Sequence, residues 1–261
     1  MGKNKLKKFE KMEEIPFVFQ YPWGRLQKEE FPLRGCWKKE FFKNNNDIVL
    51  ELGCGKGEYT VGLAERDPSK NYIGIDIKGA RMYTGATMAL DKQMSNVAFI
   101  RTSIELIEKF FTPGEVSHIW ITFPDPQMKK TTKRLTSTRF LNLYRKILAP
   151  GGVIHLKTDS PFLYTYTTLL ARDNDSAIKV LFNTSDLYSE TDTKGLNLDI
   201  RTHYEQQWLD RGLTIKYIAM TIDHDTPLEE VKEEIPEDTY RSYSRGYIQM
   251  PQLMDNINKE K

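Results

Sequence analysis

The chain has 261 residues, of which 39% are hydrophobic, and a formal net charge of +2. This length fits one large α/β domain with extensions or two small domains, and the hydrophobic fraction suffices for a buried core. A charge this close to neutral excludes a protein that is basic over its whole surface, so a nucleic-acid interface would need basic residues gathered in one region.

Apolar stretches and cysteines indicate in which cellular compartment the protein resides. The sequence has no apolar stretch of membrane-spanning length and no signal-peptide pattern, so we expect a cytoplasmic protein with no membrane partner. Its two cysteines, Cys36 and Cys54, are too far apart for a metal knuckle. We therefore predict two reduced thiols, no disulfide and no metal site.

The first 44 residues are expected to form an extension of the main domain. Residues 1–14 contain five lysines and few apolar residues, which predicts a mobile arm that is either solvated or in contact with RNA phosphates. Residues 15–32 are rich in proline and aromatic residues, so we expect an irregular segment packed on the domain. A short helix is expected over residues 37–43.

Residues 49–57 carry the clearest local motif. A short apolar run ends in Gly53, Gly55 and Gly57, and a helical pattern follows, which predicts a strand, a tight turn and a helix N-terminus. Glycine suits a positive-φ turn against which a ligand lies. Glu51, two residues before the first glycine, would repel a pyrophosphate and attract a cation such as S-adenosylmethionine (AdoMet). The alternative is a glycine loop that only turns the chain.

Two further strands are expected to end in polar residues. Residues 71–76 form the second predicted strand, and Asp76 stands where a doubly wound fold places the carboxylate that binds ribose hydroxyls. An ordinary helix N-cap is the alternative for Asp76. After a predicted helix over residues 78–94, a third strand over residues 96–100 ends just before Ser103.

The fourth predicted strand, residues 116–123, runs directly into Pro124-Asp125-Pro126. Because proline fixes the backbone and lacks an N–H donor, we expect the Asp125 carboxylate to be held at the ligand crevice. Residues 129–146 then contain seven basic residues and no acid. Their start beside the crevice favours phosphate binding over an ordinary solvated face. The predicted RNA contacts are Lys130, Lys133 and Arg134.

The rest of the chain continues the α/β pattern. We expect a helix over residues 140–148, a turn at 149–152, a strand over 153–157, a helix over 161–171, a strand over 178–182, a helix over 201–208 and a last strand over 213–222. His155 lies in an apolar strand and is expected in the core. The prediction is a doubly wound α/β sheet of seven strands in the order 3-2-1-4-5-7-6 with the last strand antiparallel, because no helix returns that strand. The domain is expected to span residues 45–223, and residues 224–261 form a tail packed on it or extending from it.

Several short sequence motifs follow one another along residues 50–217. They are Glu51-x-Gly-x-Gly-x-Gly, the acid Asp76, Phe123-Pro124-Asp125-Pro126-x-x-Lys129-Lys130, Lys157-Thr158-Asp159 and Thr202-x-x-Glu205. Together they resemble the bacterial tRNA (guanine-N7)-methyltransferases, class I enzymes that modify guanine 46 in the variable loop. The resemblance implies a Rossmann-like fold, AdoMet as cofactor and tRNA as partner.

The resemblance also implies roles for individual residues. AdoMet contacts fall at Glu51, Asp76 and Asp125, beside the glycines of the turn, and Asp125 is the implied catalytic residue. The implied substrate contacts are Lys129, Asp159, Thr202, His203, Tyr204 and Glu205.

The chain departs from the family pattern at three places. It has Gln127 where the family usually has Trp, and Thr131-Thr132 where the family has an Arg-His pair. It has Ser103 where the family favours an acid suited to the adenine amino group, so Ser103 is the expected contact and Glu105 the alternative.

The chemistry suits these residues. Guanine N7 carries a lone pair and no proton, so its methylation needs positioning and exclusion of water rather than a general base. A preorganised Asp125 carboxylate would stabilise the positive charge that develops on the base. Asp159 or Glu205 would accept the N1 and N2 protons of guanine.

Three other functions compete with this one. An AdoMet enzyme that methylates an exocyclic amine would carry an aromatic clamp of the N-P-P-Y type, which Asp125-Pro126-Gln127 lacks. Cytosine-C5 methylation needs a nucleophilic cysteine in that loop, and none is present. An RNA-binding module with a vestigial cofactor site would not need Glu51, Asp76 and Asp125 together. Monomer and homodimer both remain open.

Overall fold

The structure is a computed structural model that describes residues 10–191, 196 and 198–238, apart from the side chains of His203 and Tyr204. Residues 1–9, with four of the five lysines of the expected N-terminal arm, and residues 239–261 of the expected tail lie outside the described residues.

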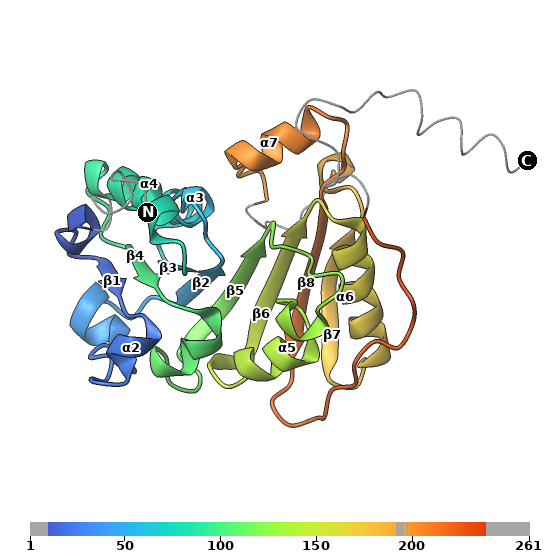
Figure 1. Cartoon of the computed structure of the whole chain (residues 1–261), viewed down its shortest axis with the longest axis horizontal. Coiled ribbons are helices and arrows are strands. Elements are labelled where there is room, and N and C mark those ends of the chain that lie inside the picture. Colours follow the sequence, from blue (N-terminus) through green and yellow to red (C-terminus); the bar gives the residue numbers. More distant parts are fainter. Residues whose placement is uncertain (1–9, 192–195, 197, 239–261) are drawn as a thin grey trace, which may run out of the picture.

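An eight-stranded sheet runs through the described chain (Figure 1). Its strands are β1 (Val18–Gln20), β2 (Ile48–Leu52), β3 (Asn71–Asp76), β4 (Val97–Arg101), β5 (Val116–Thr122), β6 (Leu148–Thr158), β7 (Ile178–Thr184) and β8 (Lys216–Ile222). Their order is β1-β4-β3-β2-β5-β6-β8-β7, and β8 is antiparallel to both of its neighbours. The predicted order and the antiparallel last strand are therefore confirmed for β2 to β8.

The predicted number of strands is wrong by one, because β1 adds to the sheet parallel to β4. It lies in a segment expected to be irregular. Val18 is buried there, and the Phe19 ring packs edge-on against Phe31 and Trp37. Burial of these apolar side chains holds three residues against the sheet edge, although so short a strand leaves no periodic pattern in the sequence.

Helices cover both faces of the sheet. The α-helices are α2 (Trp23–Leu26), α3 (Glu58–Arg66), α4 (Gly79–Asp91), α5 (Thr138–Tyr144), α6 (Pro161–Asp173) and α7 (His203–Leu209). The π-helical turn is η1 (Trp37–Phe42), and the 3-10 helices are η2 (Ile104–Lys109), η3 (Thr131–Lys133) and η4 (Leu187–Ser189). Residues of η1, α5 and α6 share one apolar cluster with the sheet, and residues of α3 and α4 share the other. Alternation along β2 explains the two layers, because Ile48 and Leu50 belong to the first cluster and Val49 to the second.

Two predicted boundaries differ from the structure. The helix expected over residues 140–148 is α5, which ends at Tyr144. The turn expected at residues 149–152 is a bulge within β6, since Val116 pairs with Leu148 and His118 pairs with Val153.

His155 is buried in β6, as predicted, and both cysteines are free thiols. No helix among the described residues is long and apolar enough to cross a membrane.

Residues 223–238, which we call the C-terminal strap, cross the outside of α5 and α6 without regular secondary structure (Figure 1). Arg145 Nη1 donates to the Thr226 carbonyl at 2.9 Å. The Glu230 carboxylate accepts hydrogen bonds from Thr138 Oγ1 at 2.9 Å and from the Tyr166 hydroxyl. Side-chain contacts therefore fasten the strap to both helices.

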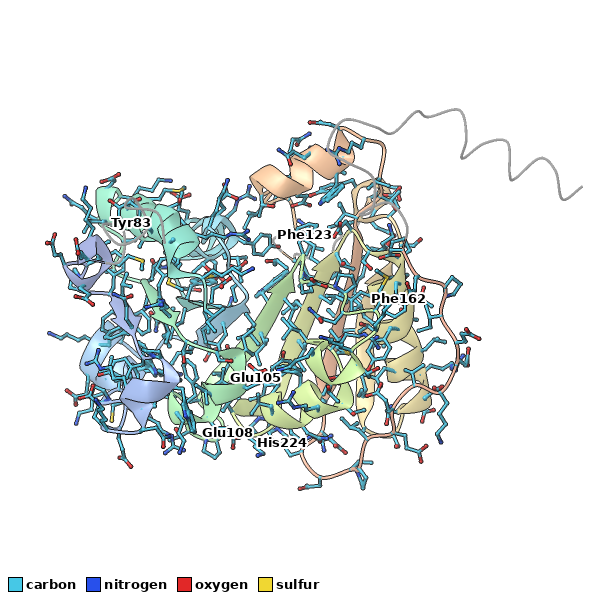
Figure 2. The ribbon with its side chains drawn as sticks, in the orientation of Figure 1. Tyr83, Glu105, Glu108, Phe123, Phe162 and His224 are labelled. Carbon is cyan, nitrogen blue, oxygen red and sulfur yellow. The ribbon has the colours of Figure 1, made fainter. Side chains whose placement is uncertain are left out.

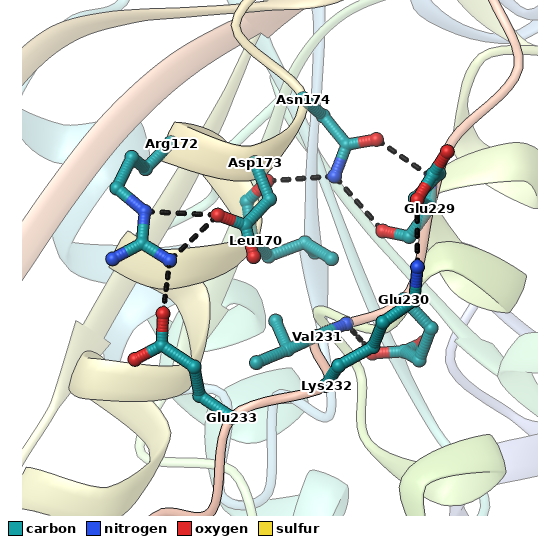
Figure 3. Close-up of polar contacts among 9 residues, drawn as sticks. All are labelled: Leu170, Arg172, Asp173, Asn174, Glu229, Glu230, Val231, Lys232 and Glu233. Atoms are coloured by element: carbon teal, nitrogen blue, oxygen red, sulfur yellow. Dashed lines mark hydrogen bonds and ion pairs between the residues drawn. The ribbon is translucent and has the colours of Figure 1, made fainter.

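Asn174, at the end of α6, forms side-chain hydrogen bonds with the backbone of the strap (Figure 3). Its Nδ2 donates to the carbonyls of Leu170 at 2.8 Å and Glu229 at 2.9 Å, and its Oδ1 accepts from the Glu229 N–H at 2.7 Å. Asn174 is only 4% exposed. One buried amide thus satisfies both backbone groups of Glu229.

We expect Asn174→Ala to lower the free energy of unfolding by about 1–3 kcal/mol, because it removes the partner of the buried Leu170 carbonyl and of both part-buried backbone groups of Glu229. Urea denaturation measures this loss. Arg172→Ala is the control on the same helix: its ion pairs with Asp173 and Glu233 are exposed, and such pairs contribute about 0–1 kcal/mol. Equal effects of the two variants would show that Asn174 does not hold the strap.

Candidate active site

A cavity of about 640 Å³ lies at the carboxyl ends of β2, β3, β4 and β5. The ends of parallel strands are where doubly wound sheets bind their ligands. The residues that follow the four strands all contribute to the walls: Gly53 and Gly55, Asp76, Ser103, and Phe123 to Asp125. Phe123 and Glu105, which are labelled in Figure 2, line two parts of the cavity. Most of the cofactor residues expected from the sequence therefore meet in one place.

The glycines of the turn have two different tasks. Gly53 and Gly55 have φ values of 77° and 56°, and an added Cβ would meet nothing within 4 Å at Gly53 and only a Gly53 oxygen at 3.9 Å at Gly55. Their backbone therefore faces open space in the cavity. Gly57 does not line the cavity, and a Cβ there would lie 2.7 Å from the Phe99 ring. The cofactor contact expected at Gly57 stays a prediction, and in the structure this glycine permits the close approach of α3 and β4.

Asp76 joins the glycine turn to the end of β3. Its Oδ2 accepts a hydrogen bond from the Gly55 N–H at 2.9 Å, and its Oδ1 accepts one from the Lys78 N–H at 2.6 Å. The carboxylate lines the cavity and is held by main-chain groups on both sides. Each oxygen keeps a further lone pair, so Asp76 can accept hydrogen bonds from a vicinal diol.

Glu51 lies behind the cavity wall. It is 3% exposed, and its carboxylate accepts hydrogen bonds from the Thr60 N–H at 2.8 Å, the Thr60 hydroxyl and the Thr122 hydroxyl at 2.6 Å. Burial raises the pKa of the Glu51 carboxyl to about 7, although the hydrogen bonds from Thr122 and Thr60 act in the opposite direction. Since Glu51 does not line the cavity, it can act on a bound cation through its charge rather than through direct contact.

Ser103 and Glu105 both line the cavity and are bonded to each other. The Ser103 hydroxyl donates to Glu105, whose other oxygen accepts from Lys133 Nζ at 3.0 Å. Burial alone would raise the pKa of Glu105, but the hydrogen bonds from Ser103 and Lys133 bring it down to about 2. The expected serine is therefore joined by the alternative carboxylate, and the pair presents a negative charge to the cavity.

The loop that carries Asp125 has an unusual backbone. Phe123 and Gln127 both have a φ of 48°, and this left-handed region is costly for bulky residues, by about 1–3 kcal/mol each. Asp125 is exposed, lines the cavity, and accepts a hydrogen bond at Oδ1 from the Gln127 N–H at 3.0 Å. The loop is thus held in a strained form that directs the Asp125 side chain along the cavity wall.

The basic run divides into exposed and buried members. Lys129 and Lys130 are exposed, and Lys130 and Lys133 line the cavity. Arg134 is only 3% exposed, and its guanidinium donates to the carbonyls of Pro126, Gln127 and Met128. The RNA contact expected at Arg134 stays a prediction, and in this structure its guanidinium is bound to protein carbonyls rather than exposed.

The two implied base-reading carboxylates are also buried. Asp159 and Glu205 are both 0% exposed, and neither lines the cavity. Glu205 forms a buried ion pair with Lys157 Nζ at 2.8 Å and accepts a hydrogen bond from the Tyr188 hydroxyl at 2.5 Å. Burial lowers the pKa of Lys157, and the charge of Glu205 opposes that shift. In this conformation neither carboxylate reaches a substrate.

Thr202 and Glu205 also begin α7. The Thr202 hydroxyl accepts from the Glu205 N–H at 3.2 Å while the Glu205 carboxylate accepts from the Thr202 N–H, which is a capping box. The Thr-x-x-Glu spacing therefore has a local structural cause. The side chains of His203 and Tyr204, implied as substrate contacts, lie outside the described residues.

Some cavity residues had no sequence signal of their own. Ile77 is 62% exposed, although it is apolar, and it lines the cavity after Asp76. Lys78 and Arg81 line the same wall at the start of α4. No motif marked these three residues, and only the position of Ile77 directly after Asp76 could have identified it. In the described part of the chain, no group of three or more His, Cys, Asp or Glu side chains is placed to hold a metal ion.

Comparison with known proteins adds an independent line of argument. A family profile described as a putative methyltransferase matches residues 45–218. A tRNA (guanine-N(7)-)-methyltransferase of Porphyromonas gingivalis is 60% identical over 90% of this chain and 97% of its own length. Another, from Bacteroides fragilis, is 57% identical over 94% of this chain and 96% of its own.

Solved structures share the fold at low identity. The 16S rRNA methyltransferase KamB matches with a TM-score of 0.55 and 14% identity over 75% of this chain and 97% of its own. A 16S rRNA (adenine(1408)-N(1))-methyltransferase of Catenulisporales acidiphilia matches with a TM-score of 0.53 and 16% identity over 77% of this chain and 97% of its own. These likenesses confirm the Rossmann-like methyltransferase fold. Since the close relatives align over nearly the whole chain, and the profile match takes in both the glycine turn and the loop of Asp125, this protein belongs to the tRNA (guanine-N(7)-)-methyltransferase family.

Proposed function

We propose that this protein transfers the methyl group of AdoMet to N7 of a guanine in tRNA, and that the target is guanine 46 of the variable loop. The observation that supports this best is the single cavity shared by the glycine turn, Asp76 and Asp125, with exposed lysines at its rim. The two relatives from Bacteroides fragilis and Porphyromonas gingivalis, which align over more than 90% of their own length, are named for this activity.

The cavity residues fit AdoMet. Gly53 and Gly55 leave open space beside their main chain, Asp76 can bind a ribose diol, and Ile77 offers an apolar surface to a purine. Glu51 supplies negative charge behind the turn, which favours a cationic ligand. When bound there, AdoMet supplies an activated methyl group on its sulfonium. We infer that Ser103 and Glu105 together take the place of the family's usual acid at the adenine amino group.

Asp125 is the proposed catalytic residue. Guanine N7 attacks with a lone pair and loses no proton, so the reaction needs alignment of the two reactants and no base. Positive charge then develops on the imidazole ring of the base. An Asp125 carboxylate fixed by its own loop stabilises that charge without reorganising during the reaction.

The exposed lysines are the proposed contacts to tRNA. Lys129, Lys130 and Lys133 lie on or beside the rim of the cavity and would neutralise backbone phosphates near the target base. The proposed guanine contacts of Asp159 and of Thr202 to Glu205 require a rearrangement on substrate binding, since both carboxylates are buried.

Location and chain organisation complete the proposal. A tRNA-modifying enzyme works where tRNA is found, so we infer the cytoplasm. We also infer that residues 45–223 form the catalytic domain, and that residues 1–44 and 224–261 are extensions of it.

Incubation of the protein with labelled AdoMet and unmodified tRNA, followed by nucleoside analysis, tests the function directly. We expect 7-methylguanosine, and we expect none from a tRNA in which guanine 46 is replaced by adenine. A product methylated on an exocyclic amine would support the competing enzyme class, and binding without any product would support an RNA-binding module.

Asp125→Asn and Lys129→Ala should separate chemistry from binding. Asp125→Asn keeps the shape and removes the charge, so we expect methylation to slow by about 100-fold or more. Lys129→Ala should weaken tRNA binding and reduce its salt slope by about one unit. Single-turnover methylation with saturating substrates measures the first, and tRNA titrations at several salt concentrations measure the second. A normal single-turnover rate in Asp125→Asn would exclude the charge-stabilisation mechanism.

The raised pKa of Glu51 predicts how AdoMet binding depends on pH. Ionised Glu51 attracts the sulfonium, so affinity for AdoMet should rise as pH increases through about 7, and Glu51→Gln should lack this rise. Calorimetric titration between about pH 6 and 8, the range around that pKa, measures the change in affinity. S-adenosylhomocysteine, which has the same amino group and no sulfonium charge, is the matched control ligand.

The same pKa sets a stability trend for the ligand-free protein. Because the folded-state pKa lies above its ordinary value of 4.5, the Glu51 contribution to folding is full below about pH 4.5 and is lost as pH rises through about 7. Glu51→Gln should therefore remove part of the stability loss over that interval. Identical pH profiles for parent and variant, in binding and in unfolding, would contradict the assignment.

A further inference from the structure

The loop that carries Asp125 needs support from outside itself. Phe123 and Gln127, on either side of Pro124-Asp125-Pro126, both have a φ of 48°. Neither residue is a glycine, and such a backbone persists only where the surroundings determine it. The hydrogen bond from Gln127 N–H to Asp125 lies within the loop, so it cannot by itself fix the loop relative to the sheet.

Arg134 supplies that support. Its Nε donates to the Pro126 carbonyl at 3.2 Å, and its Nη2 donates to the carbonyls of Gln127 at 3.2 Å and Met128 at 3.1 Å. Three consecutive carbonyls are thus bound by one rigid, planar group. Since Gln127 is itself in the left-handed region, the guanidinium acts on the strained part of the loop.

Aromatic rings hold the guanidinium in place. Its carbon lies 4.0 Å from the centroid of the Tyr166 ring and 4.8 Å from that of Phe162, both on α6 (Phe162 is labelled in Figure 2). The Tyr166 hydroxyl is bonded in turn to Glu230 of the C-terminal strap. The strap also reaches the loop directly, because the Asp238 N–H donates to Met128 Sδ at 3.1 Å while the Asp238 carboxylate accepts from Ser160 Oγ and the Phe162 N–H.

We propose that Arg134 is a positioning residue for methyl transfer: it fixes the loop of Pro126, Gln127 and Met128 so that the Asp125 carboxylate stands at the reacting base. The inference rests on the proposed role of Asp125. It assigns Arg134 a task different from that of the exposed lysines beside it, although all belong to one basic run in the sequence. Arg134 acts through the loop and does not touch the substrate.

The fork of the guanidinium is essential to this role. Lysine would keep the positive charge and the apolar stem against α6, but a point charge cannot donate in a fixed plane to three carbonyls. Displacement of a catalytic group by about 1 Å can reduce the rate about 100-fold. We therefore expect Arg134→Lys to slow single-turnover methylation by about 10-fold to 100-fold, while the Kd for tRNA, its salt slope and the Kd for AdoMet stay near those of the parent.

The experiment compares Arg134→Lys, Arg134→Gln and Lys129→Ala in the full chain. Lys129→Ala is the matched variant from the same run, and it should show a different pattern, with weaker tRNA binding and a reduced salt slope. If Arg134→Gln fails to fold, Tyr166→Leu keeps Arg134, removes one of its stacking surfaces, and should show a smaller loss of rate in the same direction. A normal saturated rate in Arg134→Lys, or a loss of tRNA affinity with a reduced salt slope, would overturn the inference.

A double variant tests whether Arg134 acts through Asp125. If it does, Arg134→Lys combined with Asp125→Asn should be little slower than Asp125→Asn alone, because the displaced group no longer carries charge. Additive losses would show that Arg134 acts independently and would overturn the inference. Failure of the underlying mechanism is recognised separately, since Asp125→Asn by itself would then keep the parent rate.

Discussion

The buried Glu51 carboxylate is the constraint on which the cavity depends. A carboxylate at 3% exposure needs several donors, and here they come from Thr60 on α3 and Thr122 at the end of β5. These hydrogen bonds connect the central strand β2 to α3, which follows the glycine turn, and to the neighbouring strand β5. The turn is therefore fixed to the sheet, and its backbone is left to face the cavity. The same side chain supplies negative charge behind the cavity wall when it is ionised.

The loop that carries Asp125 is supported by Arg134, α6 and the C-terminal strap. The loop of Asp125 is strained at Phe123 and Gln127, and it is held by Arg134 against α6. The C-terminal strap, which lies in the tail predicted after residue 223, contacts both the helix and the loop. A region far from the motifs in sequence thus helps to determine the geometry of the proposed catalytic carboxylate. This arrangement explains how a loop with two costly backbone conformations can remain preorganised.

The buried pair of Lys157 and Glu205 shows how one motif can have two uses. Both side chains are 0% exposed, and the glutamate also closes the capping box at the start of α7. A buried ion pair contributes little net stability, but the loss of one partner leaves an uncompensated charge, so α7 is held firmly over the sheet in this state. Glu205 belongs to α7, so movement of this helix would carry the Glu205 carboxylate with it. The proposed guanine contact of Glu205 therefore requires its ion pair with Lys157 to open.

The sequence by itself determined the order of the strands from β2 to β8, the glycine turn with Asp76, and the Pro-Asp-Pro loop, because each depends on local signals: apolar periodicity, positive φ and fixed proline geometry. The family resemblance rests on the same residues. Only the tertiary structure decided which members of a motif face the ligand. Gly57 packs on Phe99, Arg134 is buried under the loop, Glu205 pairs with Lys157, and β1 joins the edge of the sheet. Charge and residue type are visible in a sequence, whereas burial depends on partners that the chain brings from distant positions.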